Sequence, residues 1–164
     1  MRLYSAWLGN YGDLILHASG VMKDGVSYCF VGHSGVGKST LVKKIKALHQ
    51  DITILGEDQV ILRYKDNFFW TFGTPWHLDC SLCDPGGSPL GSLIFLTQEG
   101  DPRWTTCRPI EGVAKILKTA VIPYYNPNWV SRILDRLNAL SQKVPFYNLN
   151  YNLDTDPWPS IYNA

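Results

Sequence analysis

The residues with the clearest chemical potential form one glycine-rich run, residues 32–39, which reads Gly-His-Ser-Gly-Val-Gly-Lys-Ser. It fits Gly-x-x-x-x-Gly-Lys-[Ser/Thr], the phosphate-binding P-loop, at every fixed position. In such a loop the backbone N–H groups form a nest for phosphate oxygens, and the next helix turns its free N–H groups toward the same anion. Lys38 would neutralise phosphate charge, and the hydroxyl of Ser39 would bind Mg²⁺.

We therefore expect a nucleotide site that takes ATP and Mg²⁺, although the sequence leaves the choice between ATP and another phosphoryl donor open. The alternative, a glycine-rich turn with no ligand, is disfavoured by the Lys-Ser-Thr run that ends the motif. The predicted nucleotide-binding residues are Gly32, His33, Ser34, Gly35, Val36, Gly37, Lys38, Ser39 and Thr40.

The flanking elements have the order that this motif requires. Residues 26–31 are β-branched and aromatic, which predicts a strand, and residues 39–49 carry an apolar helical stripe, Leu41, Val42, Ile45 and Leu48. The lysines of 43–46 are interpreted as the solvated face of that helix. Strand, glycine loop and helix therefore follow one another directly.

Further along the chain, short apolar runs predict strands at 14–18, 52–55, 92–97 and 144–149, and a hairpin spans 59–72 around Lys65-Asp66. A helix is expected at 110–121, and Asn126-Pro127 is typical of a helix start. The apolar stripe behind it, 130–140, is interpreted as core or as an oligomer contact. Residues 73–89 predict a loop over the site. The expected fold is α+β, with the P-loop on a mixed, largely antiparallel sheet and flanking helices.

Composition narrows the function. The chain has 164 residues and a formal net charge of +1, so we expect a single domain, 1–164, that has neither a nucleic acid nor a membrane as its partner. No apolar stretch reaches membrane-spanning length, and the first residues lack the apolar core of a signal peptide. A cytoplasmic location with four reduced cysteines is the expectation.

The P-loop and its surroundings resemble the catalytic domain of the HPr kinase/phosphorylase family, which shares its fold with ATP-dependent PEP carboxykinase. His17 lies before the loop at the family's spacing, the loop is similar to Gly-Asp-Ser-Gly-x-Gly-Lys-Ser, and residues 55–60 resemble Ala-Asp-Asp-Arg-Val. These matches span about sixty residues. Residues 73–77 resemble a shorter branch of HPr-kinase-like proteins, some of which are taken to phosphorylate a serine of a lasso-peptide precursor.

The resemblance implies roles for particular residues. Glu57 would be the catalytic base and Asp58 would bind Mg²⁺ with Ser39, although a shift of one residue exchanges the two acids. His17 and Lys38 complete the catalytic set, with His17 either touching the γ-phosphate or orienting the acids; a purely structural histidine is the alternative. The family's second metal-binding Glu has no clear counterpart other than Asp79. Because the phosphorylase signature is missing, we expect a kinase without the reverse reaction.

Two further groups of residues are weaker substrate candidates. His77 and Asp79 would lie in the loop that faces the substrate, and Arg103 or Arg108 would stabilise the transferring phosphate, unless they are ordinary surface arginines. The spacing of His77, Cys80 and Cys83, with Cys107, also permits a structural zinc site.

The sequence therefore predicts a Mg-ATP-dependent kinase that acts on a hydroxyl, with a serine of a peptide or small protein as the expected acceptor. Its sharpest form is the C-terminal serine of a lasso-peptide precursor. Free serine or another small hydroxyl compound is the alternative acceptor. A nucleotide-binding regulatory module with little turnover is the alternative of another class. The family's HPr kinases are hexamers, which leaves a homo-oligomer open.

Overall fold

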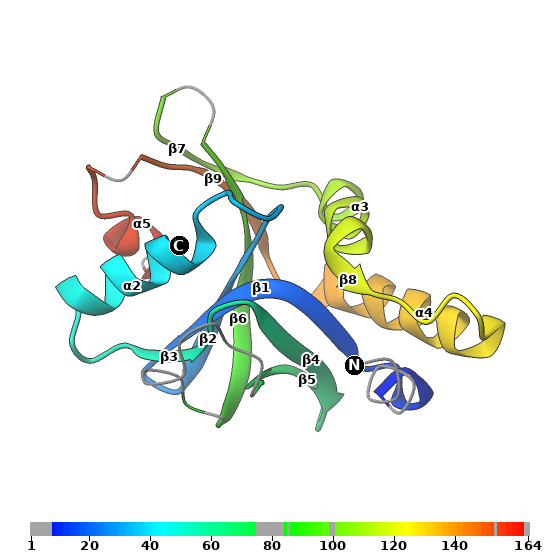
Figure 1. Ribbon diagram of the computed structural model, residues 1–164. Coiled ribbons are helices and arrows are strands. Elements are labelled where there is room, and N and C mark those ends of the chain that lie inside the picture. Colours follow the sequence, from blue (N-terminus) through cyan, green and yellow to red (C-terminus); the bar gives the residue numbers. More distant parts are fainter. Residues whose placement is uncertain (1–7, 75–83, 85, 99–100, 153, 163–164) are drawn as a thin grey trace.

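One mixed sheet with helices on both sides organises the chain (Figure 1). The computed structural model describes residues 8–74, 84, 86–98, 101–152 and 154–162. The strands are β1 (Leu14–Lys23), β2 (Val26–Val31), β3 (Thr53–Gly56), β4 (Gln59–Lys65), β5 (Phe68–Gly73), β6 (Gly87–Thr97), β7 (Arg103–Thr106), β8 (Ala120–Val121) and β9 (Phe146–Asn150). The helices are α2 (Lys38–Leu48), α3 (Pro109–Thr119), α4 (Pro127–Lys143) and α5 (Trp158–Tyr162).

The strand that leads into the P-loop lies at the junction of parallel and antiparallel pairing. β2 pairs with β1 antiparallel and with β6 parallel, and β6 pairs with β9 parallel. The other pairings of described strands are antiparallel: β1 with β3, β4 and β8, β4 with β5, β5 with β6, and β7 with β9. The predicted mixed, largely antiparallel sheet is confirmed.

The hairpin β1–β2 delivers the chain to the P-loop. Asp24 and Gly25 take φ values of 51° and 77°, which is the twist that a tight two-residue hairpin turn needs. β1 is long and bends, because its first half pairs with β4 and its second half pairs with β2. This bend puts His17, near the middle of β1, beside the turn between β3 and β4, since His17 pairs with Gln59.

Two apolar cores cover the two faces of the sheet. Side chains alternate along the central strands, so that Val31 and Phe95 point to one core while Phe30 and Ile94 point to the other. The first core is closed by α3 and α4, and the second by α2 and α5. Figure 1 shows these two helix pairs on opposite sides of the sheet.

Several boundaries differ from the sequence expectation. β1 and β6 are longer than predicted, since residues 19–23 and 87–91 continue their strands. Short β7, β8 and α5 were not expected, because two to five residues carry too little periodicity to identify an element. The cap at Asn126 is confirmed, since its side chain accepts from the backbone N–H groups of Asn128 and Trp129.

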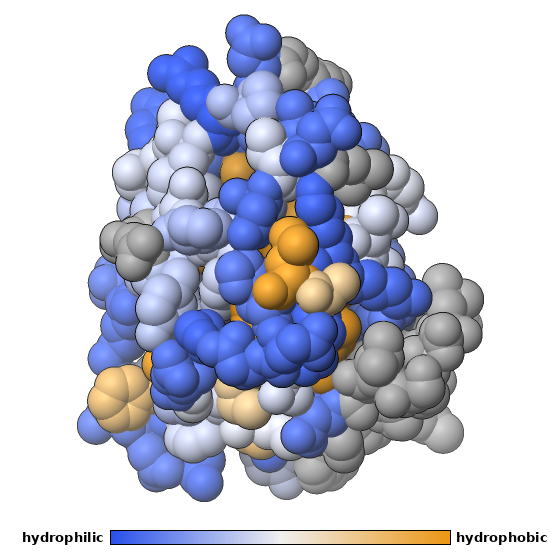
Figure 2. Space-filling view, turned by 90° about the vertical axis from the view of Figure 1, so that its left-hand side faces the viewer, coloured by the Kyte–Doolittle hydropathy of each residue, from blue (hydrophilic) through white to orange (hydrophobic). Residues whose placement is uncertain are grey.

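The surface seen in Figure 2 is mostly hydrophilic, with an apolar patch near its centre and smaller apolar groups around it. Lys44 and Lys46 of α2 donate to the backbone oxygens of Thr155 and Gln50, as residues on a solvated helix face. Lys43 is exposed as the solvated-face interpretation predicts, and its ammonium also reaches a buried carboxylate, whereas Ile45 is fully buried with the apolar stripe. None of the described helices is long and apolar enough to cross a membrane.

Candidate active site

The P-loop curls between the end of β2 and the start of α2. Gly35 and Gly37 have φ values of 83° and 85°, in the left-handed region that favours glycine. A Cβ on Gly37 would lie 2.2 Å from the hydroxyl oxygen of Tyr151, so this position has no room for a side chain. Gly37 is also the N-cap of α2 and supplies no side-chain cap to the free N–H groups of the first turn. Those N–H groups and the helix dipole suit a phosphate.

The ammonium group of Lys38 lies folded against the loop. It donates to the backbone oxygens of Gly32 at 2.9 Å and His33 at 3.0 Å, and to Nε2 of His17 at 3.0 Å. Burial lowers the pKa of Lys38, while the negative charge of Asp58 acts in the opposite direction. A phosphate would replace these neutral acceptors with a full negative charge, which suits a desolvated ammonium group.

His17 contacts both Lys38 and the acidic turn, which is formed by Glu57 and Asp58 between β3 and β4. Its Nδ1 lies 3.1 Å from Oδ1 of Asp58, and its Nε2 accepts from Lys38. Both contacts are satisfied when Nδ1 carries the proton and donates to the carboxylate, so we assign that tautomer. The result is a continuous chain of contacts, Asp58 to His17 to Lys38, in which the carboxylate fixes the orientation of the imidazole ring.

The two acids of the turn have different surroundings. The side chain of Asp58 is 40% exposed, whereas that of Glu57 is 3% exposed and has Oε2 3.3 Å from Nζ of Lys43. Oε1 of Glu57 is buried and has no hydrogen-bond partner among the described residues. The backbone oxygen of Glu57 accepts from the hydroxyl of Ser39 at 3.1 Å, which ties the acidic turn to the first turn of α2.

A cavity of about 260 Å³ lies over the P-loop. The residues that line it are His17, Ser34, Gly35, Gly37, Lys38, Ser39, Thr40 and Asp58. The structure thus brings together His17, Lys38, Ser39 and Asp58 from the set suggested by the sequence. Glu57 does not line this cavity.

The weaker substrate candidates lie elsewhere. Arg103 of β7 lines a different cavity with Trp104, and Arg108 forms an ion pair with Glu111 at the start of α3. The structure does not bring either arginine to the P-loop cavity. His77, Asp79, Cys80 and Cys83 lie outside the described residues, as does most of the expected loop. Cys107 is buried, and burial raises the pKa of its thiol.

Magnesium fits the oxygen groups beside the start of α2. Ser39 offers a hydroxyl, Asp58 offers an accessible carboxylate, and Glu57 holds a buried carboxylate oxygen that no described residue contacts by a hydrogen bond. Hard divalent cations prefer such oxygen ligands, and Mg²⁺ commonly uses one or two carboxylates together with water and substrate phosphate. No group of three or more His, Cys, Asp or Glu side chains with metal-binding geometry occurs among the described residues.

Sequence reasoning missed three residues that shape the loop. Tyr151 donates to the backbone oxygen of Val36 at 3.0 Å and accepts from Gln98 at 3.1 Å. Burial raises the pKa of Tyr151, so its hydroxyl keeps its proton at neutral pH. No motif marks Tyr151 or Gln98. The position of Lys43 was readable, because it lies four residues after Ser39 and so shares its helix face.

Comparisons with known proteins find similarity among solved structures. No protein-family model matches the chain, and no curated protein matches it significantly. Among solved structures, the chain is similar to the Hpr(Ser) kinase/phosphatase from Coxiella burnetii, with 15% identity over 78% of this chain and 97% of that chain, at a TM-score of 0.45. Because chemistry resides in the site and not in the overall fold, the function of this chain is argued from its own residues.

Proposed function

We propose that the protein is a Mg-ATP-dependent kinase that transfers the γ-phosphate of ATP to the hydroxyl of a serine in a peptide or small protein. The observation that carries this proposal is the chain of contacts from Asp58 through His17 to Lys38 at the P-loop cavity. A P-loop alone suits any nucleotide-binding protein. An accessible carboxylate held beside the P-loop lysine adds a proton acceptor for an incoming hydroxyl.

The phosphate side of the reaction rests on the loop. The N–H groups at the start of α2 bind the α- and β-phosphates, and Lys38 reaches the β- and γ-phosphates. Its three present acceptors are neutral, so the lysine is free to exchange them for phosphate oxygens. Phosphoryl transfer depends on positioning and on neutralising charge, and the buried lysine supplies both.

Asp58 is the proposed proton acceptor, because it lines the cavity and His17 orients it. Magnesium would be held by Ser39 and by the carboxylate of Glu57, whose backbone oxygen accepts from Ser39 and whose Oε1 has no hydrogen-bond partner among the described residues. When bound, it would neutralise charge on the phosphate oxygens. The opposite assignment, with Glu57 as base and Asp58 as metal ligand, requires the buried side chain of Glu57 to leave Lys43. The variants Glu57→Gln and Asp58→Asn separate the two assignments.

The acceptor is proposed to be a serine, with the C-terminal serine of a lasso-peptide precursor as its sharpest form. Transfer without reverse phosphorolysis is part of the same proposal. Free serine or another small hydroxyl compound is the alternative acceptor. A regulatory nucleotide-binding module, the alternative of another class, needs Lys38 and Ser39 but no proton acceptor. The position of Asp58 therefore favours the kinase.

The test is mass spectrometry of a lasso-peptide precursor that ends in serine, after incubation with the protein and Mg-ATP. A gain of one phosphate on a serine, lost in Lys38→Ala and kept in the control Lys46→Ala, supports a peptide kinase. ATP binding without any phosphate gain favours a small acceptor or the regulatory module. If the wild-type protein does not bind ATP, the proposal as a whole is overturned.

A further inference from the structure

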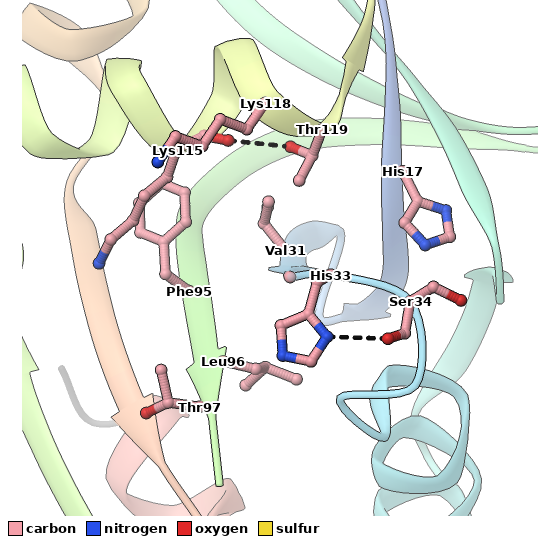
Figure 3. Close-up of a pocket in the computed structure, with 11 residues that line it drawn as sticks. His17, Val31, His33, Ser34, Phe95, Leu96, Thr97, Lys115, Lys118 and Thr119 are labelled. Carbon is pink, nitrogen blue, oxygen red and sulfur yellow. Dashed lines mark hydrogen bonds between the residues drawn. The ribbon is translucent and has the colours of Figure 1, made fainter. Parts of the chain in front are cut away.

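A second and larger cavity opens beside the P-loop. It has a volume of about 560 Å³ and extends from the end of β2 across β6 to α3 (Figure 3). Val31, Phe95 and Leu96 give it apolar walls, and Figure 3 shows His17 and Ser34 on the side of the P-loop. The P-loop motif and the acidic turn do not account for this cavity.

The contacts of Lys38 indicate which phosphate of a bound nucleotide this cavity would adjoin. In a P-loop protein with bound nucleotide, the lysine reaches the β- and γ-phosphates, whereas the N–H groups at the start of the helix bind the α- and β-phosphates. Lys38 is therefore expected beside the γ-phosphate. Its ammonium contacts His17, Gly32 and His33, and all three residues line the larger cavity. Thr40, at the opposite end of the loop, lines only the smaller cavity. The larger cavity therefore adjoins the phosphate that is transferred and not the nucleoside.

The chemistry of the walls restricts what the cavity can take. Lys115 is fixed in place, because its Nζ donates to Asn148 at 2.5 Å and lies 5.0 Å from the ring centroid of Phe95. Lys118, one turn further along α3, is exposed and also lines the cavity. An apolar interior beside two cations suits a molecule that joins an apolar group to an anionic one.

We propose that this cavity binds the phosphoryl acceptor, and that the acceptor carries an apolar group next to a carboxylate or another anion. This inference rests on the proposed kinase function. The acceptor's hydroxyl oxygen forms a bond to the γ-phosphorus while the bond from that phosphorus to the β–γ bridging oxygen breaks. The hydroxyl proton passes to the carboxylate of Asp58, and ADP leaves.

Three small serine peptides test the inference: acetyl-Phe-Ser with a free carboxylate, its C-terminal amide, and acetyl-Gly-Ser with a free carboxylate. Each offers the same hydroxyl, and the initial rate of phosphate transfer from Mg-ATP is followed by mass spectrometry. We expect kcat/KM for acetyl-Phe-Ser to exceed that of the amide by about fivefold, the effect of one favourable ion pair. We expect a similar advantage over acetyl-Gly-Ser, which lacks the apolar group.

Lys118→Ala should remove the preference for the free carboxylate, so that kcat/KM for the acid falls to that for the amide measured with the same variant. Lys143→Ala, at an exposed lysine that ends α4, is the matched control and should keep the preference. ATP affinity, measured separately by calorimetry, should be the same in all three proteins.

Each of the other outcomes contradicts a particular part of the proposal. Equal rates for acid and amide, or a preference that survives in Lys118→Ala, overturns the acceptor cavity and leaves the kinase intact. A fall in ATP affinity in Lys118→Ala assigns the cavity to the nucleotide. Absence of transfer to all three peptides by protein that binds ATP counts against the acceptor chemistry, and absence of ATP binding counts against the kinase itself.

Discussion

The two cavities that meet at His17 and Ser34 are built in opposite ways. The smaller one, about 260 Å³, is lined by loop backbone and by the polar side chains of Lys38, Ser39 and Asp58. The larger one, about 560 Å³, has apolar walls from Val31, Phe95 and Leu96 of β2 and β6, two lysines of α3 at one side and the first residues of the P-loop at the other. Under the proposed function, phosphate binding is concentrated in one short segment, whereas the choice of acceptor is distributed over distant elements.

Removing the charge from the smaller cavity should have the largest effect. Lys38→Ala deletes the ammonium group that neutralises the transferring phosphate, so we expect transfer to fall by about 10³-fold. Lys38 does not itself line the larger cavity, although its ammonium contacts three residues that do, His17, Gly32 and His33. Transfer rates measured under saturating Mg-ATP, with circular dichroism to check folding, test this expectation.

Lys46→Ala serves as the control for that experiment, since Lys46 lies on the same helix and bonds only to Gln50 among the contacts described. If Lys38→Ala transfers phosphate at a rate within tenfold of the wild-type rate, the assignment of phosphate binding to the smaller cavity is wrong.

Replacing the acids sharpens the comparison within the smaller cavity. Asp58→Asn keeps the shape but removes the proton acceptor, and we expect kcat to fall by about 10²-fold while ATP still binds. Glu57→Gln should instead raise the Mg²⁺ concentration needed for half-maximal rate, because its carboxylate is the proposed Mg²⁺ ligand and its backbone oxygen is tied to Ser39. A titration of rate against Mg²⁺ for both variants distinguishes the roles. The assignment is reversed if Glu57→Gln lowers kcat at saturating Mg²⁺ and Asp58→Asn shifts the Mg²⁺ requirement.

A change in the core behind the larger cavity should affect stability without affecting chemistry. Leu137 of α4 is fully buried in the apolar core that also contains Val31 and Phe95. Leu137→Ala should lower the free energy of unfolding by about 2–5 kcal/mol. Urea denaturation measures this loss, and kcat/KM at low temperature should stay near the wild-type value.

The matched control on the same helix is Leu134→Ala, because the side chain of Leu134 is 47% exposed. Its effect on unfolding should be below about 1 kcal/mol. If Leu137→Ala lowers the transfer rate at a temperature where the protein is fully folded, the core affects catalysis as well as stability, which contradicts this prediction.

The same contrast explains what the sequence could predict. The P-loop, its strand and its helix were readable because one contiguous motif fixes the turn, the helix start and the charge. His17 and Asp58 were found through their similarity to a known pattern, and the structure brings them into contact. The sheet type followed from hairpins that turn residues mark, such as the one predicted around Lys65-Asp66, whose turn the structure places one residue later at Asp66-Asn67.

The rest depended on contacts between residues far apart in sequence. Tyr151 reaches Val36 across 115 positions, and nothing in the local pattern distinguishes it from other tyrosines. The larger cavity combines β2, β6 and α3, and side chains such as Phe95 read as ordinary core. The contrast between Glu57 and Asp58 arises from the pairing of β1 with β3 and β4, which decides which side chain is buried.

The tyrosine that supports the P-loop gives a smaller effect. Tyr151→Phe keeps the ring in the core and removes the donor to the backbone oxygen of Val36. The loop would lose about 1 kcal/mol of positioning, so we expect ATP affinity to weaken about fivefold with kcat for bound ATP little changed. Calorimetric titration with ATP measures the shift, and Tyr162→Phe, whose hydroxyl bonds to exposed Asp24, is the control. Equal ATP affinities in Tyr151→Phe and the wild-type protein would show that Gln98 and backbone contacts are enough to position the P-loop.

The smallest effect at neutral pH, and the most specific to the smaller cavity, is the pH dependence of Lys38. Burial lowers the pKa of Lys38, so the ammonium loses its proton at a lower pH than an exposed lysine. ATP affinity should therefore fall as the pH rises from neutral to about 10. Stability should move the other way, because the unfolded chain binds more protons over that range and unfolding becomes less favourable as the pH rises. Lys38→Arg keeps its charge, so it should flatten both profiles, whereas a fall in ATP affinity that persists in Lys38→Arg would assign the titration to another group.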